Sequence, residues 1–310
     1  MTSPAGLWLL AHGAAHHLEA REVLRWWSWE PAVVASLMIT AAIYGVGLAR
    51  LWRGAGRDRG IRWWEAGAFA TGWLALVIAL VSPLDALGAI LFSAHMAQHE
   101  VLMLVAAPLM VLGRPLIPLL WALPRRARER AGAWTKRPAV SATWRLVTGP
   151  LAVFAIHGVA LWAWHLPSLY KATLRNELVH AFQHLSFFGS AALFWWALVH
   201  GRYGRAGYGL SALYVFATGV HSGALGALLT FAPRVWYPIY DATARQWGLS
   251  AIEDQQMAGL IMWVPSGLVF VVIGLALVAA WMGEAARRVA HTGSESLLRP
   301  GSDRIGAGGR

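Results

Sequence analysis

Two histidine pairs with the same spacing are the residues of this sequence best suited to chemistry. His95 and His99 form one pair, and His180 and His184 form the other. Residues four apart lie on one face of a helix, so each pair can present two imidazoles to a single ion. Two such helices facing each other would supply four nitrogen ligands. The spacing therefore predicts a metal site. It is not the site of a zinc protease of the known pattern, because the sequence lacks HExxH.

Thioether donors beside these histidines indicate copper. On a helix, His95, Met96, His99 and Met103 fall within an arc of roughly 100°. Copper accepts imidazole beside thioether where no thiolate is available, whereas zinc makes little use of methionine, and the chain has no cysteine. Asp254 is expected either to orient a ligand imidazole or to cap the start of its own helix. The predicted metal ligands are His95, Met96, His99, Met103, His165, His180, His184 and Asp254.

Other polar residues of the apolar segments leave two interpretations open. His157 and His221 fall near the middle of their helices, where they could ligate a haem iron axially or form hydrogen bonds between helices. Glu100 follows His99 but points about 100° away from it around the helix. It could contact a ligand of the site without binding the ion, or it could be a proton-linked group. His12, His16 and His17 could collect copper, or belong to a disordered terminus.

Membrane helices must position these residues, because the composition excludes a water-soluble domain. The 310 residues are 57% hydrophobic and only 13% charged. Soluble proteins carry about 25% charged residues. The formal charge of +11 would suggest nucleic acid in a soluble protein. Here the basic residues lie in short loops between apolar runs, where they set topology, so no nucleic acid partner is expected.

The apolar runs predict an all-α, polytopic membrane protein with seven transmembrane helices. Each run has the roughly 20 residues that a helix needs to cross a bilayer. Pro108 and Pro265 lie inside runs and are expected to kink their helices. The predicted spans are Pro31 to Trp52, Trp63 to Val81, Ser93 to Leu112, Leu146 to Leu166, Val179 to His200, Gly209 to Phe231 and Asp254 to Met282.

The distribution of lysine and arginine predicts the orientation. Twenty of the 26 basic residues fall on one side of the predicted membrane and six on the other, so the N-terminus is expected outside and the C-terminus inside. Eight of the twelve histidines then lie at the outer side. Residues 1–30 are expected to form an extracytoplasmic tail, 31–282 the seven-helix domain, and 283–310 a disordered cytoplasmic tail. The N-terminus lacks a basic region, so no cleaved signal peptide is expected.

Three strings of the sequence resemble a known family. They are SAHMAQHEVLMLVAAPLMVLGRP from Ser93, WHLPSLYKATLRNELVHAFQHLSFFGSAALFWWALV from Trp164 and YPIYDATARQWGLSAIEDQQMAGLIMWVPSG from Tyr237. Together they are similar to the seven-helix CtaG-like family of cytochrome c oxidase assembly factors. Glu100 departs from the family pattern, in which an apolar residue is usual. The matching positions are His95, Met96, Gln98, His99, His165, Tyr170, His180, His184, Asp254, Gln255, Gln256, Gly259, Met262 and Trp263.

The resemblance implies a multi-pass protein of the bacterial inner membrane that helps to build a haem-copper oxidase. Its expected partners are oxidase subunits, a copper ion and membrane lipid. Oxidase copper sites lie toward the outer side, which is where the predicted ligands lie. A copper transporter, or a membrane electron carrier with haem between two histidines, are the alternatives.

Two other classes of protein are not expected. The only lysines, Lys136 and Lys171, both fall in loops, which excludes a retinal protein with a Schiff base inside the bundle. The sequence also shows no catalytic triad, phosphate-binding loop or carboxylates paired on one face. An enzyme is therefore not expected.

Overall fold

A computed structural model describes the backbone of residues 23–200 and 207–297, which form helices and no strands. Six helices in these ranges are long and apolar enough to cross a membrane, and a bent pair could make a seventh. The chain therefore has the form of a multi-pass membrane protein. The six are α3 (Pro31–Ala55), α4 (Trp63–Val81), the joined α6, η1 and α7 (Phe92–Leu112), α13 (Glu177–His200), α15 (Tyr208–Thr230) and α17 (Ala251–Leu297).

The predicted fourth span is not one straight helix. Its residues belong to α10 (Pro138–Val147) and α11 (Pro150–Trp164), whose axes differ in direction by 57°. Proline disfavours the helical conformation in the residue before it, and Gly149 is extended, with φ −70° and ψ 151°. The prediction of a single span from Leu146 to Leu166 was therefore wrong at this break, and seven spans result only if the bent pair counts as one.

The third span changes its helical type before Pro108. α6 (Phe92–Glu100) is followed by a π-helical segment, η1 (Val101–Ala106), and then by α7 (Ala107–Leu112). Proline has no N–H to bond the carbonyl of the preceding turn. The Met103 carbonyl instead accepts a hydrogen bond of 2.9 Å from the indole of Trp195 on α13. A neighbouring helix thus satisfies the backbone, as bundles in membranes require. Pro265, in contrast, lies inside an uninterrupted α17.

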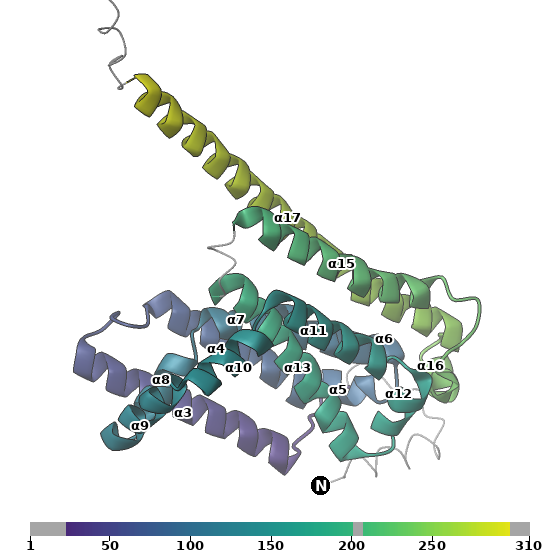
Figure 1. Ribbon diagram of the computed structural model, residues 1–310. Coiled ribbons are helices and arrows are strands. Elements are labelled where there is room, and N and C mark those ends of the chain that lie inside the picture. Colours follow the sequence, from purple (N-terminus) through teal and green to yellow (C-terminus); the bar gives the residue numbers. More distant parts are fainter. Residues whose placement is uncertain (1–22, 201–206, 298–310) are drawn as a thin grey trace, which may run out of the picture.

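The helices pack side by side, and α15 and α17 run antiparallel (Figure 1). α15 and α17 pair along one side of the molecule, and α17 also contacts α6. α11 packs on α13, and α4 packs on α7. α3 lies on the opposite side from the α15 and α17 pair and contacts α8 (Leu116–Ala122). The short helices between the spans also include α5 (Pro83–Gly88), α9 (Arg125–Thr135), α12 (Pro167–Thr173), η2 (Pro238–Tyr240) and α16 (Asp241–Gln246).

The last helix extends past its expected end at Met282. α17 continues to Leu297, past the expected end of the seventh span, and disorder of the tail stays a prediction. Glu284, Ala285, Ala286 and Arg287 are good helix formers, which explains the continuation. Residues 298–310 lie outside the described residues. The N-terminal residues 1–22, with His12, His16 and His17, also lie outside them.

The outer surfaces of the long helices are apolar. Leu213, Phe216 and Val220 on α15, and Leu268 and Leu275 on α17, each expose about half or more of their side chains. Exposed apolar surface of this extent is typical of contact with lipid. The buried side of α6, α11, α13, α15 and α17 forms the larger of two apolar cores.

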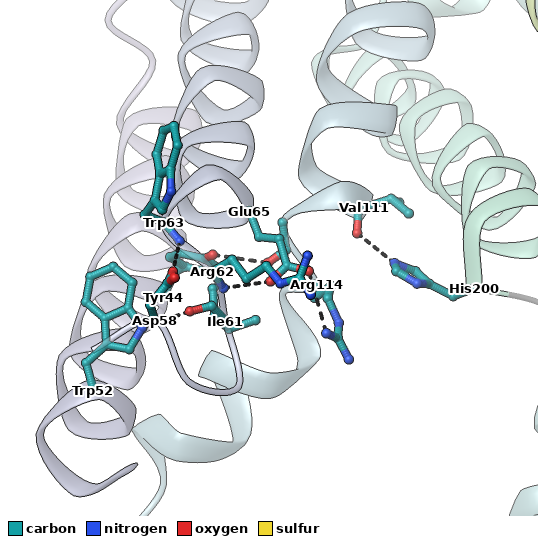
Figure 2. Close-up of polar contacts among 11 residues, drawn as sticks. Tyr44, Trp52, Asp58, Ile61, Arg62, Trp63, Glu65, Val111, Arg114 and His200 are labelled. Atoms are coloured by element: carbon teal, nitrogen blue, oxygen red, sulfur yellow. Dashed lines mark hydrogen bonds and ion pairs between the residues drawn. The ribbon is translucent and has the colours of Figure 1, made fainter. Parts of the chain in front are cut away.

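One end of the bundle is held by polar contacts around Glu65, which Figure 2 shows. The buried Glu65 carboxylate accepts a hydrogen bond of 2.7 Å from the backbone N–H of Arg62 and pairs with Arg114 at 3.5 Å. Tyr44 donates to the Gly113 carbonyl at 3.1 Å. His200 lies at this end as well, 3.1 Å from the Val111 carbonyl. This end therefore has a structural network, and the remaining described histidines lie elsewhere.

Candidate metal centre

Three imidazoles meet between α6 and α13. One ring nitrogen from each of His95, His180 and His184 lies within 4.8 Å of the other two. The ring centroids of His95 and His180 are 5.3 Å apart, and those of His180 and His184 are 4.2 Å apart. His95 faces α13 because it falls on the inner side of the first turn of α6. The geometry brings two predicted helix faces together around a space that suits one ion. We call these residues, with His99, the histidine cluster.

Each histidine of this cluster has at least one ring nitrogen without a hydrogen-bond partner in the described structure. The Nε2 atoms of His95, His180 and His184 are buried and accept or donate no hydrogen bond within the described structure. His95 also interacts with the backbone of Gly88. Such a contact on one nitrogen directs the other toward an ion. A buried polar atom without a partner is costly, and a bound cation would remove that cost.

His99 lies beside the group of three and outside its closest approach. Its ring centroid is 4.4 Å from that of His95 and 5.3 Å from that of His184. The ring of Phe187 packs edge-on against it at 4.6 Å. Neither ring nitrogen of His99 has a hydrogen-bond partner in the described structure. A rotation of the side chain could therefore make His99 a fourth ligand.

His165 and Met96 form a separate nitrogen and sulfur pair. His165 follows α11, and its Nδ1 lies 2.6 Å from the Leu161 carbonyl, a separation at which Nδ1 carries the proton and donates. Nε2 then has only a lone pair, and it faces the Met96 sulfur at 3.4 Å. Two lone pairs do not form a hydrogen bond. Nitrogen and sulfur bound to one tetrahedral ion, with bond lengths of about 2.0 and 2.3 Å, would be about 3.5 Å apart.

Asp254 has a different position from the predicted ones. Its two carboxylate oxygens accept hydrogen bonds of 2.7 and 3.0 Å from the backbone N–H groups of Phe92 and Ser93. It therefore caps the start of α6, the helix that carries His95 and His99, and not the start of its own helix. A carboxylate at a helix N-terminus is favourable because of the free N–H groups and the helix dipole. Asp254 thus positions the helix that carries His95 and His99 through its backbone.

Met103 is not brought to the histidine cluster. It lies on η1 and lines a small cavity together with Glu100, His157 and Met262. The predicted arc of His95, Met96, His99 and Met103 is therefore divided between two sides of the third span. A π-helical turn contains more than four residues, so it shifts the residues that follow it away from the face of α6.

Two carboxylates lie close enough to His180 to act on it electrostatically. Asp85 and Glu177 both interact electrostatically with the His180 ring. Partial burial, followed by repulsion from Glu177 and Asp85, raises the pKa of Glu30 at the start of α3. Like charges held near each other favour the arrival of a cation. Asp85 is further held by Gln98, whose amide donates to it at 2.8 Å.

Tyrosines cover the histidine-bearing end of the bundle. The Tyr170 and Tyr240 hydroxyls are 2.7 Å apart, and Tyr240 also donates to the Gly88 carbonyl at 3.2 Å. Tyr237 donates to the His165 carbonyl at 2.6 Å. Burial raises the pKa of Tyr237 and of Tyr240, so both remain protonated donors. This layer holds Gly88 and His165 in place.

Several of these supporting residues had no role in the sequence-based prediction. Gly88, Asp85 and Tyr240 fall in segments between spans, where the sequence alone does not indicate a contact with a ligand. Gln183, which interacts with His95, could have been found. It is a polar residue inside an apolar run, and such residues face the interior of a bundle.

The middle of the bundle holds His157 and His221. Their ring centroids are 6.2 Å apart, and His157 Nδ1 lies 3.0 Å from the Ser190 hydroxyl. The cavity that His157 lines encloses about 30 Å³. That space holds one or two water molecules, so a porphyrin could enter only if the surrounding helices separated.

Comparisons with known proteins extend over most of the chain. Uncharacterized protein Mb0105 of Mycobacterium bovis is 29% identical over 277 residues, and uncharacterized protein ML1998 of Mycobacterium leprae is 26% identical over 272 residues. These matches cover 86% and 82% of this chain but only 41% and 39% of the relatives' own length. No solved structure gives a significant match. The model of the family described as cytochrome c oxidase caa3 assembly factor (Caa3_CtaG) matches residues 42–284, and the chain belongs to that family.

Proposed function

We propose that this protein delivers or inserts copper during assembly of cytochrome c oxidase, at the outer face of the bacterial inner membrane. The observation that carries the proposal is the histidine cluster. One ring nitrogen from each of three histidines, on two helices, lies within 4.8 Å of the other two. The Nε2 atoms of these histidines are buried and have no hydrogen-bond partner in the described structure. Neutral imidazoles are common ligands of copper. Met96 and His165, a sulfur and a nitrogen donor facing each other at 3.4 Å, are further candidate ligands.

The position of the cluster supports this role. It lies at the start of α6 and of α13, which the distribution of basic residues assigns to the outer side. The carboxylates of Asp85 and Glu177 beside His180 would attract a cation from that side. The role is one of binding and transfer and involves no catalysis. Oxidase subunits would accept the copper.

Transport of copper across the membrane is the second candidate function. The observation that favours it is the cavity deeper in the bundle, where Met103, His157 and Met262 could form a further step. A transporter and a delivery factor differ in what their loss does to the cell. Loss of an exporter causes sensitivity to copper, whereas loss of a delivery factor causes a need for copper.

The test is a strain that lacks the gene, grown at limiting copper and complemented with variants. We expect cytochrome c oxidase activity to fall while oxidase polypeptides and haem remain, and extra copper to restore part of it by mass action. The wild-type gene should restore activity at limiting copper. A gene carrying H180A and H184A should not, because two of the three close ligands are gone.

His200→Ala is the matched control for this experiment. His200 lies at the opposite end of α13 and contacts the Val111 carbonyl, so its loss should leave copper delivery intact. Full oxidase activity in the deletion strain at limiting copper would contradict the proposal. Copper sensitivity of that strain would favour the exporter.

A further inference from the structure

We propose that the chain has a second copper(I) site, inside the bundle and separate from the histidine cluster. The site is the cavity between the third span and helices α11, α15 and α17. The inference rests on the proposed function only for the identity of the metal. The polar residues that line the cavity, together with its two thioethers, are Glu100, Met103, His157, Ser222, Met262 and Ser266.

The donor set of the cavity is soft and buried. Met103, Met262 and His157 expose only 7%, 5% and 7% of their surface. Thioethers bind copper(I) in preference to the harder cations, and imidazole binds it as well. Met103, His157 and Met262 come from three different elements and line one cavity, which a lone methionine in an apolar core would not explain. The cavity volume of about 30 Å³ accommodates a single ion.

The hydrogen bonds of His157 leave one nitrogen for a ligand role. The Ser190 hydroxyl lies 3.2 Å from the Phe187 carbonyl and 3.0 Å from His157 Nδ1. In the arrangement in which Ser190 donates its single proton to the carbonyl, it accepts a hydrogen bond from His157 Nδ1. With the proton on Nδ1, Nε2 has a free lone pair. A fixed proton on one ring nitrogen is the usual arrangement of a metal-binding histidine.

Glu100 supplies the charge that such an ion requires. Its Oε2 is buried and has no hydrogen-bond partner in the described structure. A carboxylate inside a membrane is costly unless a cation or a proton neutralises it. A copper(I) ion beside one carboxylate gives a neutral site, and neither charge remains unpaired in the bilayer. The carboxylate also favours an ion over the water that could fill the same space.

Leu161 and α6 connect the cavity to the Met96 and His165 pair. Leu161 lines the cavity, and its carbonyl holds His165 Nδ1 at 2.6 Å. Met96 and Glu100 are four apart on α6, so they lie on one face of that helix. The same two elements thus carry donors at both depths. An ion at the outer level has a second set of ligands about one helical turn further into the bundle.

The test counts copper(I) ions on the full chain in detergent, by competition with a chromophoric copper(I) chelator. We expect two equivalents for the wild type. A protein with H180A and H184A should retain one. A protein with M103L and M262L, which preserve side-chain volume, should retain the equivalent at the histidine cluster. It should lose the equivalent in the cavity, because the affinity there falls by at least about 10-fold. Met38 and Met282 are exposed, so M38L with M282L is the matched control and should keep both.

X-ray absorption at the copper edge provides a measurement that does not depend on comparing yields of variants. The H180A and H184A protein should show sulfur ligands, and Glu100→Gln should weaken its remaining site. One equivalent that only the histidine changes remove would overturn the second site and leave the proposed function standing. One equivalent that only the methionine changes remove would support the second site and overturn the histidine cluster. A wild type that binds no copper would overturn both.

Discussion

At the scale of single residues, Asp254 connects two parts of the chain that are 162 positions apart. Its carboxylate holds the first N–H groups of α6, and His95 and His99 follow within two turns. The proposed copper affinity and the stability of the fold therefore depend on the same residue. A change at Asp254 should affect both properties, although Asp254 touches no ion in this arrangement.

Replacing Asp254 with asparagine tests this connection. The amide has one oxygen where two are needed, and it lacks the charge that favours a helix N-terminus, so we expect a loss of about 1 to 2 kcal/mol. Thermal unfolding in detergent should show a lower midpoint, and the chelator competition should show weaker copper binding. Asp241→Asn is the control, because Asp241 pairs only with Arg245 on the surface. Equal midpoints for the two variants would contradict the capping role.

The sequence predicts donor types better than it predicts their contacts. Spacing four apart is enough to place His95 beside His99 and His180 beside His184, because helical geometry is regular. The sequence does not indicate that Gly88 and Gln183 approach His95, or that Asp254 caps another helix. Those contacts depend on how helices that are distant in sequence pack together. Met103 shows the same limit, since the π-helical turn that moves it has no simple sequence signal.

At the scale of helices, the close packing of α15 on α17 depends on glycine. A Cβ atom on Gly259 would lie 2.6 Å from the Gly226 carbonyl oxygen and 2.6 Å from the Thr230 nitrogen. No real side chain tolerates such distances, so the helices would have to separate. α17 also carries Met262 and Asp254, so its position determines the deep cavity and the start of α6.

Gly259→Ala should therefore destabilise the protein by about 1 to 3 kcal/mol, as overpacking does. The lower unfolding midpoint should be accompanied by loss of the copper equivalent assigned to the cavity. Gly267→Ala is a control on the same helix, because a Cβ there meets no atom within 4 Å. It should be neutral or stabilise α17 by up to about 1 kcal/mol. Equal effects of the two changes would show that close approach of α15 does not matter.

Apolar length makes the helices the most predictable level of this fold. The second predicted span, Trp63 to Val81, has the same bounds in the structure, and the third differs by one residue. The prediction of the fourth span failed because hydropathy does not depend on the direction of the helix axis. The 57° bend at Gly149 and Pro150 therefore leaves the apolar run of the sequence continuous. The end of α17 was missed for a related reason, since a helix can continue into water after its apolar residues end.

At the scale of the whole molecule, the proposed function depends on which side of the membrane holds the histidine cluster. Twenty of the lysine and arginine residues fall on the side of the predicted membrane that holds α9, and six fall on the side that holds α12. Arg125, Arg126, Arg128 and Arg130 all belong to α9. Retention of positively charged loops in the cytoplasm predicts an outer position for the histidine cluster. Copper reaching it would come from outside the cytoplasm.

Single cysteines test this orientation cleanly, because the native chain has none. Ser168 lies exposed on α12, at the histidine-bearing end, and Ser141 lies on α10 next to the basic loop. A membrane-impermeant maleimide added to intact cells should label a cysteine at 168 and should not label one at 141. Both should react after the cells are broken, which controls for accessibility. The reverse pattern in intact cells would place the histidine cluster in the cytoplasm, on the wrong side for loading copper into an oxidase from outside.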